Sequence, residues 1–310
     1  MATGAARRMG IIAEATYGAG APATPAFDIM LVRSGGPELT TDTLEDDTIR
    51  GDFQRQGVRI GARKGTLKLN DWLRYGAYDA WLEALLGGTW AANVLKTGMT
   101  RRSFAIEEYF ADLATAENEY HMWDGCEFSS LDIKVANNQL VSADFGGVCR
   151  NLTPSTSAIA SSTYNAASTN QPFSFKDASF TADGSALGII TAWNLKIDRG
   201  LQPRYVANGI YSLRPDSKVV KVNGSVDVWL DVGATALITA WLAETQKALG
   251  LSLVDPAGNR LAINVPALRF TSGSPNVSGD GSIPVALSFE AYYDSVTSSQ
   301  LTITRTPHGA

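Results

Sequence analysis

Few residues in this sequence have the chemistry that catalysis or metal binding needs. There are two histidines, His121 and His308, and two cysteines, Cys126 and Cys149. The cysteines are not spaced as Cys-x-x-Cys, so a zinc site is not expected. They lie at equal distances from a turn predicted at Asn137-Asn138, which would let them face each other across a hairpin. With no wider cysteine framework, we expect a reduced, buried pair rather than a disulfide.

The acidic cluster Glu45-Asp46-Asp47 is the other candidate for chemistry. It is too compact for a calcium loop, whose ligands alternate along the chain. Arg50, Arg55 and Arg59 follow it closely, so a solvated loop that forms ion pairs at an interface is the better interpretation. The sequence contains neither a Gly-x-Ser-x-Gly motif nor a phosphate-binding Gly-Lys-Ser/Thr loop. We therefore predict that the protein is not an enzyme and has no cofactor and no metal.

Composition describes a folded protein that does not grip nucleic acid. The chain has 310 residues, of which 45% are hydrophobic and 18% charged, and its formal net charge is −5. Tight binding of nucleic acid needs a basic excess, because affinity comes from neutralised phosphates. We see neither a signal peptide nor an apolar run long enough to cross a membrane, so we expect synthesis in the cytoplasm. The missing signal also argues against an outer-membrane barrel.

The chain divides into two halves that resemble each other. The stretch 153–171 is rich in Ser, Thr, Ala and Asn and is predicted to be a linker between domains at 1–152 and 172–310. Each half has a strand that opens with Gly-Thr or Gly-Ser, at Gly65 and Gly224. Each then has a helical segment with Ala-Trp-Leu, at 80–82 and 240–242, and we expect these helices to end at Gly87 and Gly250. A hairpin follows each helix. This order indicates an internal duplication.

Strict alternation of apolar and polar residues predicts the strands. Leu131, Ile133 and Val135 alternate with polar residues, and four further segments do the same around Val141, Trp193, Val226 and Val285. Sheets of this kind have one face on a core and one in water. The fold class predicted is α+β, mainly antiparallel β, with one helix covering the apolar face in each half.

Five segments of the sequence resemble phage tail tube (major tail) proteins of long-tailed bacteriophages. They are EATYGAGAPATPAF (14–27), DTIRGDFQRQGVRIGARKGTLKL (47–69), YGAYDAWLEALLGGTW (75–90), RRSFAIEEYF (101–110) and VSGDGSIPVALSFEAYYD (277–294). The resemblance covers nearly the whole chain in the right order. It implies β-sandwich tube domains that form a barrel, here two in tandem, each with a flanking α-helix. It also implies a structural virion protein that assembles into stacked rings, the conduit for viral DNA. Another tail component on the same fold, a tail terminator or a baseplate hub protein, is the alternative.

Strand arithmetic favours a ring of three chains. If each tube domain gives four strands, twelve strands close a barrel of about 24 Å, too narrow for a duplex once side chains fill it. Twenty-four strands give a backbone diameter of about 48 Å and an opening near 38 Å. Two domains in each chain then predict a trimeric ring with pseudo-sixfold symmetry; without the duplication, six chains are needed.

The polar strand faces are the predicted lining of the lumen, which DNA passes without specific binding. The lumen candidates are Asp132, Lys134, Asp144, Lys196, Asp198, Asp227 and Glu290. Acids outnumber lysines in this set, which predicts a weakly negative wall that repels phosphates. Long segments before each Gly-Thr/Ser strand are predicted to stack one ring on the next, head to tail. The stacking candidates are Asp46, Asp47, Arg50, Arg55, Arg59, Arg63, Arg204, Arg214, Lys218 and Lys221. The partners expected are further copies of the chain and other tail proteins (tape measure, terminator and baseplate), with no membrane.

Overall fold

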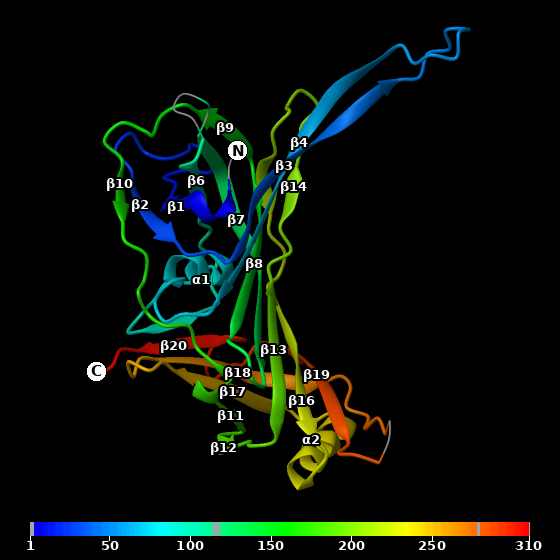
Figure 1. The fold of residues 1–310 in the computed structure, drawn as a ribbon. Helices are drawn as coiled ribbons and strands as arrows, with labels where there is room; N and C mark the ends of the chain where they lie inside the picture. Colours follow the sequence, from blue (N-terminus) through cyan, green and yellow to red (C-terminus); the bar gives the residue numbers. More distant parts are fainter. Residues whose placement is uncertain (1–2, 114–116, 118, 278–279, 310) are drawn as a thin grey trace.

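Antiparallel strands dominate the computed structural model, which describes residues 3–113, 117, 119–277 and 280–309 (Figure 1). These residues form twenty β-strands and two α-helices. Every strand pairing among them is antiparallel except that of β10 with β2. The fold is therefore α+β with mainly antiparallel β, as the alternating pattern predicts. Ser278 and Gly279, in the loop of the hairpin predicted in the second half, lie outside the described residues.

In the first half of the chain, four strands lie side by side in the order β3-β4-β8-β7. The beginning of β7 continues past them and pairs with β6 and β9, and β6 pairs in turn with β1. The elements of this half are η1 Gly4–Ala6, β1 Arg7–Ala13, β2 Ala26–Met30, β3 Ser34–Asp46, β4 Gly57–Trp72, α1 Asp79–Leu86, β5 Val94–Lys96, β6 Phe104–Phe110, β7 Tyr120–Ala136, β8 Ser142–Cys149, β9 Asn151–Ser155 and β10 Thr163–Asn165.

The second half has the same strand pairings in the same order. Four strands follow as β13-β16-β19-β18, and the beginning of β18 pairs with β17 and β20. Strand β17 then pairs with β11. The elements are η2 Phe175–Asp177, β11 Ala178–Ala182, β12 Ser185–Ala186, β13 Ile190–Asp198, β14 Gln202–Arg204, β15 Leu213–Asp216, β16 Lys221–Trp229, α2 Val232–Leu242, β17 Lys247–Val254, β18 Arg260–Phe270, β19 Pro284–Ala291 and β20 Thr302–Thr306.

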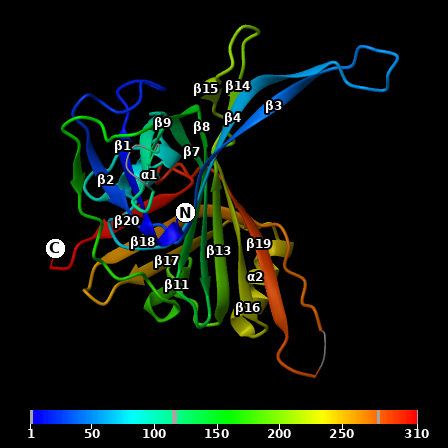
Figure 2. The ribbon, with the colours of Figure 1, turned by 45° about the horizontal axis from the view of Figure 1, so that its top comes forward.

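The two sets of four strands are joined edge to edge by β7 and β13. Residues 130–136 of β7 pair with residues 192–198 of β13. The result is one sheet, β3-β4-β8-β7-β13-β16-β19-β18, which we call the long sheet (Figure 2). Because this ladder crosses from one half to the other, hydrogen bonding does not separate the halves.

Alternation along the strands builds the core, as predicted. Leu131, Ile133 and Val135 are buried, and so are their neighbours across the β7–β13 joint, Trp193 and Leu195. Aromatic rings fill the space between α1 and the sheet: Trp81 stacks on Phe128 at 5.0 Å and meets Phe145 edge-on at 4.9 Å. One continuous cluster of buried apolar side chains extends through both halves.

The first predicted helix is confirmed, whereas the end of the second is wrong. Helix α1 ends at Gly87, whose left-handed backbone lets its N–H donate to the Glu83 carbonyl. Helix α2 ends at Leu242, and Gly250 lies inside strand β17. There Gly250 is flanked by β11 and β18, and a Cβ on it would lie 2.6 Å from Thr181 Oγ1. Pairing on both edges of β17 outweighs the helical pattern of the sequence.

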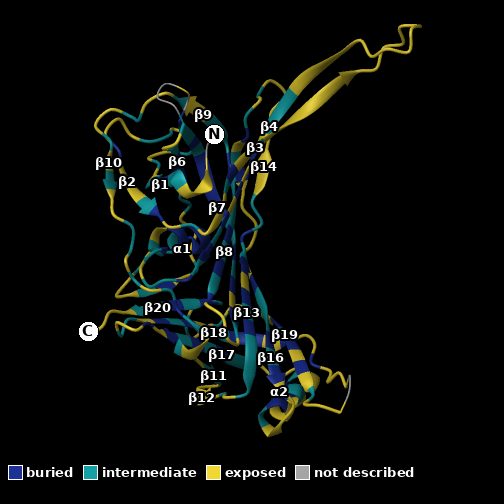
Figure 3. Cartoon of the chain, viewed as in Figure 1, coloured by how far each residue is buried: buried dark blue, intermediate teal, exposed yellow. Residues whose placement is uncertain are grey.

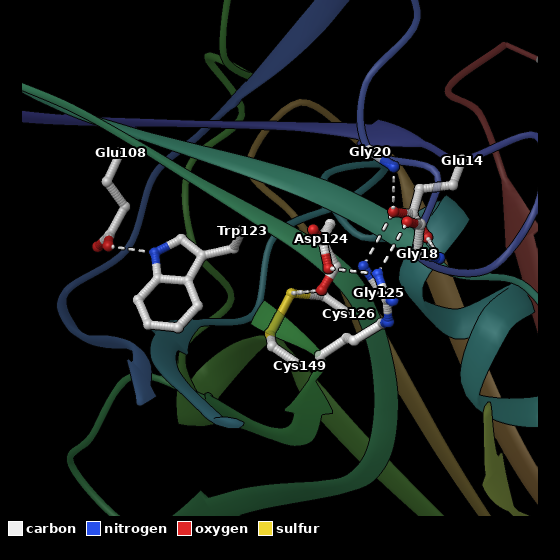
Figure 4. Close-up of a disulfide and its surroundings, with 10 residues drawn as sticks. Glu14, Gly18, Gly20, Glu108, Trp123, Asp124, Gly125, Cys126 and Cys149 are labelled. Atoms are coloured by element: carbon white, nitrogen blue, oxygen red, sulfur yellow. Dashed lines mark hydrogen bonds and ion pairs between the residues drawn. A yellow bond between two sulfur atoms is a disulfide. The ribbon is translucent and has the colours of Figure 1, made fainter. Parts of the chain in front are cut away.

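The prediction that the two cysteines stay reduced is also wrong. Cys126 and Cys149 form a disulfide across the β7–β8 hairpin (Figure 4). Direct pairing of Glu127 with Val148 sets the two cysteines opposite each other, one step further along the ladder. Cross-strand partners of this kind have Cβ atoms close enough for a disulfide. Two cysteines without a wider framework are usually reduced, but here the register of the hairpin brings them together as a disulfide.

The stretch predicted as a linker is tied to the first half by hydrogen bonds. It contains the end of β9, which pairs with β7, and all of β10, which pairs with β2. After it, Phe173 enters the core: its N–H donates to the Leu73 carbonyl and its carbonyl accepts from the Val141 N–H. The division into domains at 1–152 and 172–310 stays a prediction.

Replacing Phe173 tests how firmly this return of the chain supports the fold. Phe173 has no exposed surface, so Phe173→Ala removes a buried ring and should lower the free energy of unfolding by about 3–5 kcal/mol. Phe175→Ala is the control, since that ring is 39% exposed. Urea unfolding of the unassembled protein measures both. Equal losses in the two variants would contradict the packing described here.

Candidate functional site

All seven lumen candidates lie on the solvent face of the long sheet. Asp132 of β7 sits opposite Asp144 of β8 on one side and opposite Lys196 of β13 on the other. Asn223 of β16 extends the row, because it lies opposite both Lys196 and Glu290. Lys134, Asp198 and Asp227 occupy alternate positions on the same strands and therefore share this face. We call it the polar face.

The polar face carries more basic residues than the sequence reasoning found. Lys68 shares a face with Asn70, which lies opposite Asp144, and Arg269 lies opposite Glu290. Lys221, predicted as a stacking residue, lies opposite Asp198 on the polar face instead. Arg33 stacks on Trp72 at its margin, at 4.2 Å from the ring centre. These additions, with Glu38 as a further acid, bring acidic and basic groups close to balance. The predicted excess of acids holds for the candidate set but not for the whole face.

Charged side chains on the polar face interact within β7 and between β7 and β8. Lys134 Nζ lies 3.5 Å from an Asp132 carboxylate oxygen. Burial raises the pKa of Asp144 above its ordinary value, the Lys134 and Arg33 charges oppose that rise, and Asp132 adds to it. Burial alone raises the pKa of Asp227. Acidic and basic side chains thus face each other across neighbouring strands, as Asp132 does Lys196, Asp198 does Lys221 and Glu290 does Arg269.

Strands β3 and β4 extend beyond the rest of the molecule as a hairpin, and Figure 1 shows this projection clearly. We call residues 42–60 the long arm; most of it is exposed (Figure 3). It carries the stacking candidates Asp46, Asp47, Arg50, Arg55 and Arg59. Arg55 is paired with Glu45 at 2.8 Å and Arg50 with Asp52 at 3.2 Å, both in the open.

The long arm also exposes large apolar side chains that the sequence reasoning passed over. Ile49 and Phe53 at its tip are almost wholly exposed, and Leu44, Val58 and Ile60 along its strands are more than half exposed. In the sequence, these apolar residues stand singly among charged ones, and that pattern could have indicated an exposed contact surface. So many exposed apolar side chains on one projection are unusual for a surface that stays in water.

Strands β14 and β15 form a second, shorter hairpin that folds back on the first half. We call residues 202–216 the short arm. The Arg63 N–H of β4 donates to the Ile210 carbonyl at 2.8 Å, and the Tyr205 hydroxyl donates to the Arg63 carbonyl at 2.9 Å. The Arg63 side chain reaches Asn151 and Tyr211. Arg63 therefore already has partners within its own chain.

A buried carboxylate holds the short arm in place. Glu127 of β7 is 3% exposed and accepts from Arg214 Nε at 2.6 Å and from Arg101 Nη2 at 2.5 Å. Arg199, at the end of β13, donates to the Ala84 carbonyl in the last turn of α1. Burial lowers the Arg199 pKa, and the charge of Glu127 opposes that shift. Charged groups from both halves thus meet around Glu127.

The other stacking candidates of the second half differ in their surroundings. Arg204 pairs with Asp216 at 3.2 Å, and both side chains are half exposed. The Lys218 N–H donates to the Arg199 carbonyl, and the stem of Lys218 packs near Gly200. Of the ten candidates, the five on the long arm project into solvent beyond the body, whereas Arg204, Lys218 and Lys221 are exposed on the body itself.

Glu14, in the first segment of the family resemblance, organises a loop beside the disulfide. Its carboxylate accepts from the N–H groups of Gly18, Gly20 and Gly125 (Figure 4). Next to it, burial raises the pKa of Asp124 to about 6, while the Arg150 charge lowers it and the Glu14 charge raises it. These bonds give Glu14 and the glycines that follow it a structural role at the start of the chain.

The described residues bring no catalytic set together. No group of three His, Cys, Asp or Glu side chains among them is placed to hold a metal ion. Burial lowers the His121 pKa, and its ring meets Phe110 edge-on at 5.1 Å. A cavity of about 490 Å³ beside α1 is lined by Asp79 and Arg74, but these pair with Arg305 and Asp71. No helix in the described part of the chain is long and apolar enough to cross a membrane.

The comparison with protein families decides the identity. The model of the phage tail tube protein family matches residues 4–291. The chain belongs to the phage tail tube protein family. A search of curated proteins finds no match. As a tail tube protein, the chain is a structural protein of the phage tail and is located in the virion.

Removing the charge of Glu127 tests the contact between the halves of this tail tube protein. Glu127→Gln leaves Arg101 and Arg214 without their buried counter-charge, so the free energy of unfolding should fall by about 3 kcal/mol. Glu45→Gln breaks the exposed pair with Arg55 and should cost less than about 1 kcal/mol. Urea unfolding of the unassembled protein measures both variants. A loss for Glu127→Gln as small as that of the control would show that the cluster does not hold the short arm.

Proposed function

We propose that three copies of this protein close into a ring, and that the rings stack head to tail into a tube through which viral DNA is ejected. The long sheet is the observation that carries the proposal. It presents one continuous polar face, its other face is buried, and each half supplies four of its strands. A wall for a water-filled channel needs a surface of this kind.

The matching pairings of the two halves support two tandem tube domains, at 1–152 and 172–310, joined by 153–171. Strands β3, β4, β8, β7, β6, β1 and β9 correspond to β13, β16, β19, β18, β17, β11 and β20. The agreement includes an irregularity: the register shifts between Phe104 and Ile106 in the β6–β7 ladder, and between Lys247 and Leu249 in β17–β18. Bulges are specific features of a fold, so a shared one favours duplication.

The width of the channel favours three chains. Eight strands from each of three chains make a barrel of twenty-four, with a backbone diameter of about 48 Å and an opening near 38 Å. Duplex DNA, about 20 Å across from its groove dimensions, passes through such an opening. Two chains would give sixteen strands and an opening of about 22 Å by the same measure, which leaves almost no clearance around the duplex.

The polar face then lines the lumen. Its candidates Asp132, Lys134, Asp144, Lys196, Asp198, Asp227 and Glu290 are joined there by Lys68, Lys221 and Arg269. A strongly basic wall would hold phosphates by releasing their counterions. Near balance of charge, with basic residues opposite acidic ones on neighbouring strands, lets DNA slide without being held.

The long arm is the proposed contact between rings. Its charged residues Asp46, Asp47, Arg50, Arg55 and Arg59 give direction to the contact, and Ile49 and Phe53 supply apolar area to bury. In this proposal Arg63 and Arg214 fix the base of each arm rather than reaching the next ring, while Arg204 stays on the exposed side of the short arm.

The remaining parts of the proposal follow from membership of the family. The protein is made in the host cytoplasm and works as a structural component without catalysis or cofactor. Its partners are copies of itself and the tape measure, terminator and baseplate proteins of the tail. DNA is a passing cargo and not a specific ligand.

Electron microscopy of the purified protein tests the proposal. The wild type should form tubes of uniform width, and the double variant Ile49→Ser, Phe53→Ser should form rings that fail to stack. Val296→Ser is the matched control, because Val296 is equally exposed but lies away from the long arm. Tubes of normal length in the double variant would remove the arm from stacking. A wild type that forms neither rings nor tubes under any condition would contradict the proposed function.

A further inference from the structure

The joint between β7 and β13 is a contact between two equivalent sheets inside one chain. Seven residue pairs, from Ala192 with Ala136 to Asp198 with Ser130, hold the edge of one four-stranded set to the edge of the other. The same two kinds of edge occur a second time in the chain. In the second half the counterpart of β7 is β18, and in the first half the counterpart of β13 is β3.

Both of these counterparts have an unpaired edge. Strand β3 pairs with β4 only, and the last residues of β18, Leu268–Phe270, pair with β19 on the long-sheet side. The other edge of Leu268 is paired with Lys247 of β17, but after Leu268 no described strand covers that edge of β18, and none covers the outer edge of β3. Free edges of this length are normally covered in the assembled state of a protein.

The chain beyond β18 already lies in the position of a continued strand. The Thr271 N–H donates to the Ser288 carbonyl of β19 at 2.8 Å, and the Ser288 N–H donates to the Ser272 hydroxyl at 3.3 Å. Gly273 then packs against Leu287, and a Cβ on it would lie 3.0 Å from that side chain. In β7, by contrast, the corresponding stretch continues as strand through the joint with β13.

Apolar surface beside this edge lacks the cover that its counterpart has. Leu82 of α1 is 4% exposed, whereas Leu242, at the matching place after Ala-Trp in α2, is 70% exposed. Trp229 and Val232 near the start of α2 are also exposed. Gly273 contacts Trp241, so α2 and the free edge form one continuous surface. A partner that pairs with the edge would also lie over this apolar area.

We propose that the ring closes by pairing β3 of one chain, antiparallel, with residues 270–274 of the next chain, which lengthen β18 when they gain this partner. The proposal rests on the ring assembly proposed above and names its subunit contact. It repeats between chains the joint that β7 and β13 make within one chain. The second copy is the occupant because its β3 has the edge that corresponds to β13.

The register of the proposed joint follows from the shared bulge, and Pro275 sets where the joint ends. Matching the two bulges sets Cys126 against Leu268, which places Ser272 where Ser130 lies in β7. Ser130 faces Asp198 of β13. Tracing the pairings of each half outward from the matched bulges gives Thr40 as the counterpart of Asp198 in β3, and Glu38 is the neighbouring position on the same face. Pro275 has no N–H to donate, so the new ladder ends before it.

Cysteine cross-linking tests this joint in assembled protein. Chains that carry Ser272→Cys with either Thr40→Cys or Glu38→Cys should, on oxidation, give covalent oligomers up to the trimer on a non-reducing gel. Ser272→Cys with Thr41→Cys is the matched control, because Thr41 points to the opposite face of β3 and should leave monomers. Single-cysteine variants set the background.

Hydrogen exchange provides a second measurement that needs no substitution. The amides of 270–274 and of β3 should exchange at least about tenfold more slowly in tubes than in the unassembled protein, because they gain ladder partners. Tubes whose 270–274 amides stay unprotected, and whose cysteine pairs stay monomeric, would overturn the joint and leave the proposed function standing. Absence of rings and tubes in the wild type would overturn both.

Discussion

The antiparallel ladder between β7 and β13 fixes the form of this molecule. It joins strands from the two halves of the chain, so that side chains far apart in sequence alternate in step on a shared surface. A slip of one residue in this register would turn Asp132 and Lys134 toward the core and Leu131 toward water. The cost of burying those charges and exposing those apolar groups keeps the two halves in one geometry. The polar face exists because that register is held.

Charged side chains support the ladder at the end where Ser130 pairs with Asp198. Glu127 is buried on β7, and the arginines it binds come from both halves of the chain. Such a carboxylate costs much free energy to bury and repays it only when its partners are in place. The short arm is therefore held to the first half, whereas the long arm has no such contact and projects freely. The short arm thus makes its contacts within the chain, whereas the long arm is available for contact with another chain.

Sequence reasoning predicted the features that depend on local periodicity. The alternating strands, the helix that ends at Gly87 and the shared face of the seven lumen candidates all follow from a pattern of two or of 3.6 residues. It missed features that depend on which strands become neighbours. Gly250 ended no helix because β17 has partners on both edges, and Lys221 moved from a predicted loop to the polar face through its pairing with Asp198. The disulfide of Cys126 and Cys149 and the buried Glu127 cluster depend in the same way on register and on contacts across the chain.

The central claim is that the eight strands of the long sheet act as one third of a closed channel wall. Electron cryomicroscopy of the tubes, with helical reconstruction, tests it most directly. The account predicts three chains in each ring, with β7 and β13 adjacent in the wall and Asp132, Lys196 and Glu290 turned toward the channel. Six chains in each ring, or a tube whose inner surface is formed by other strands, would contradict it.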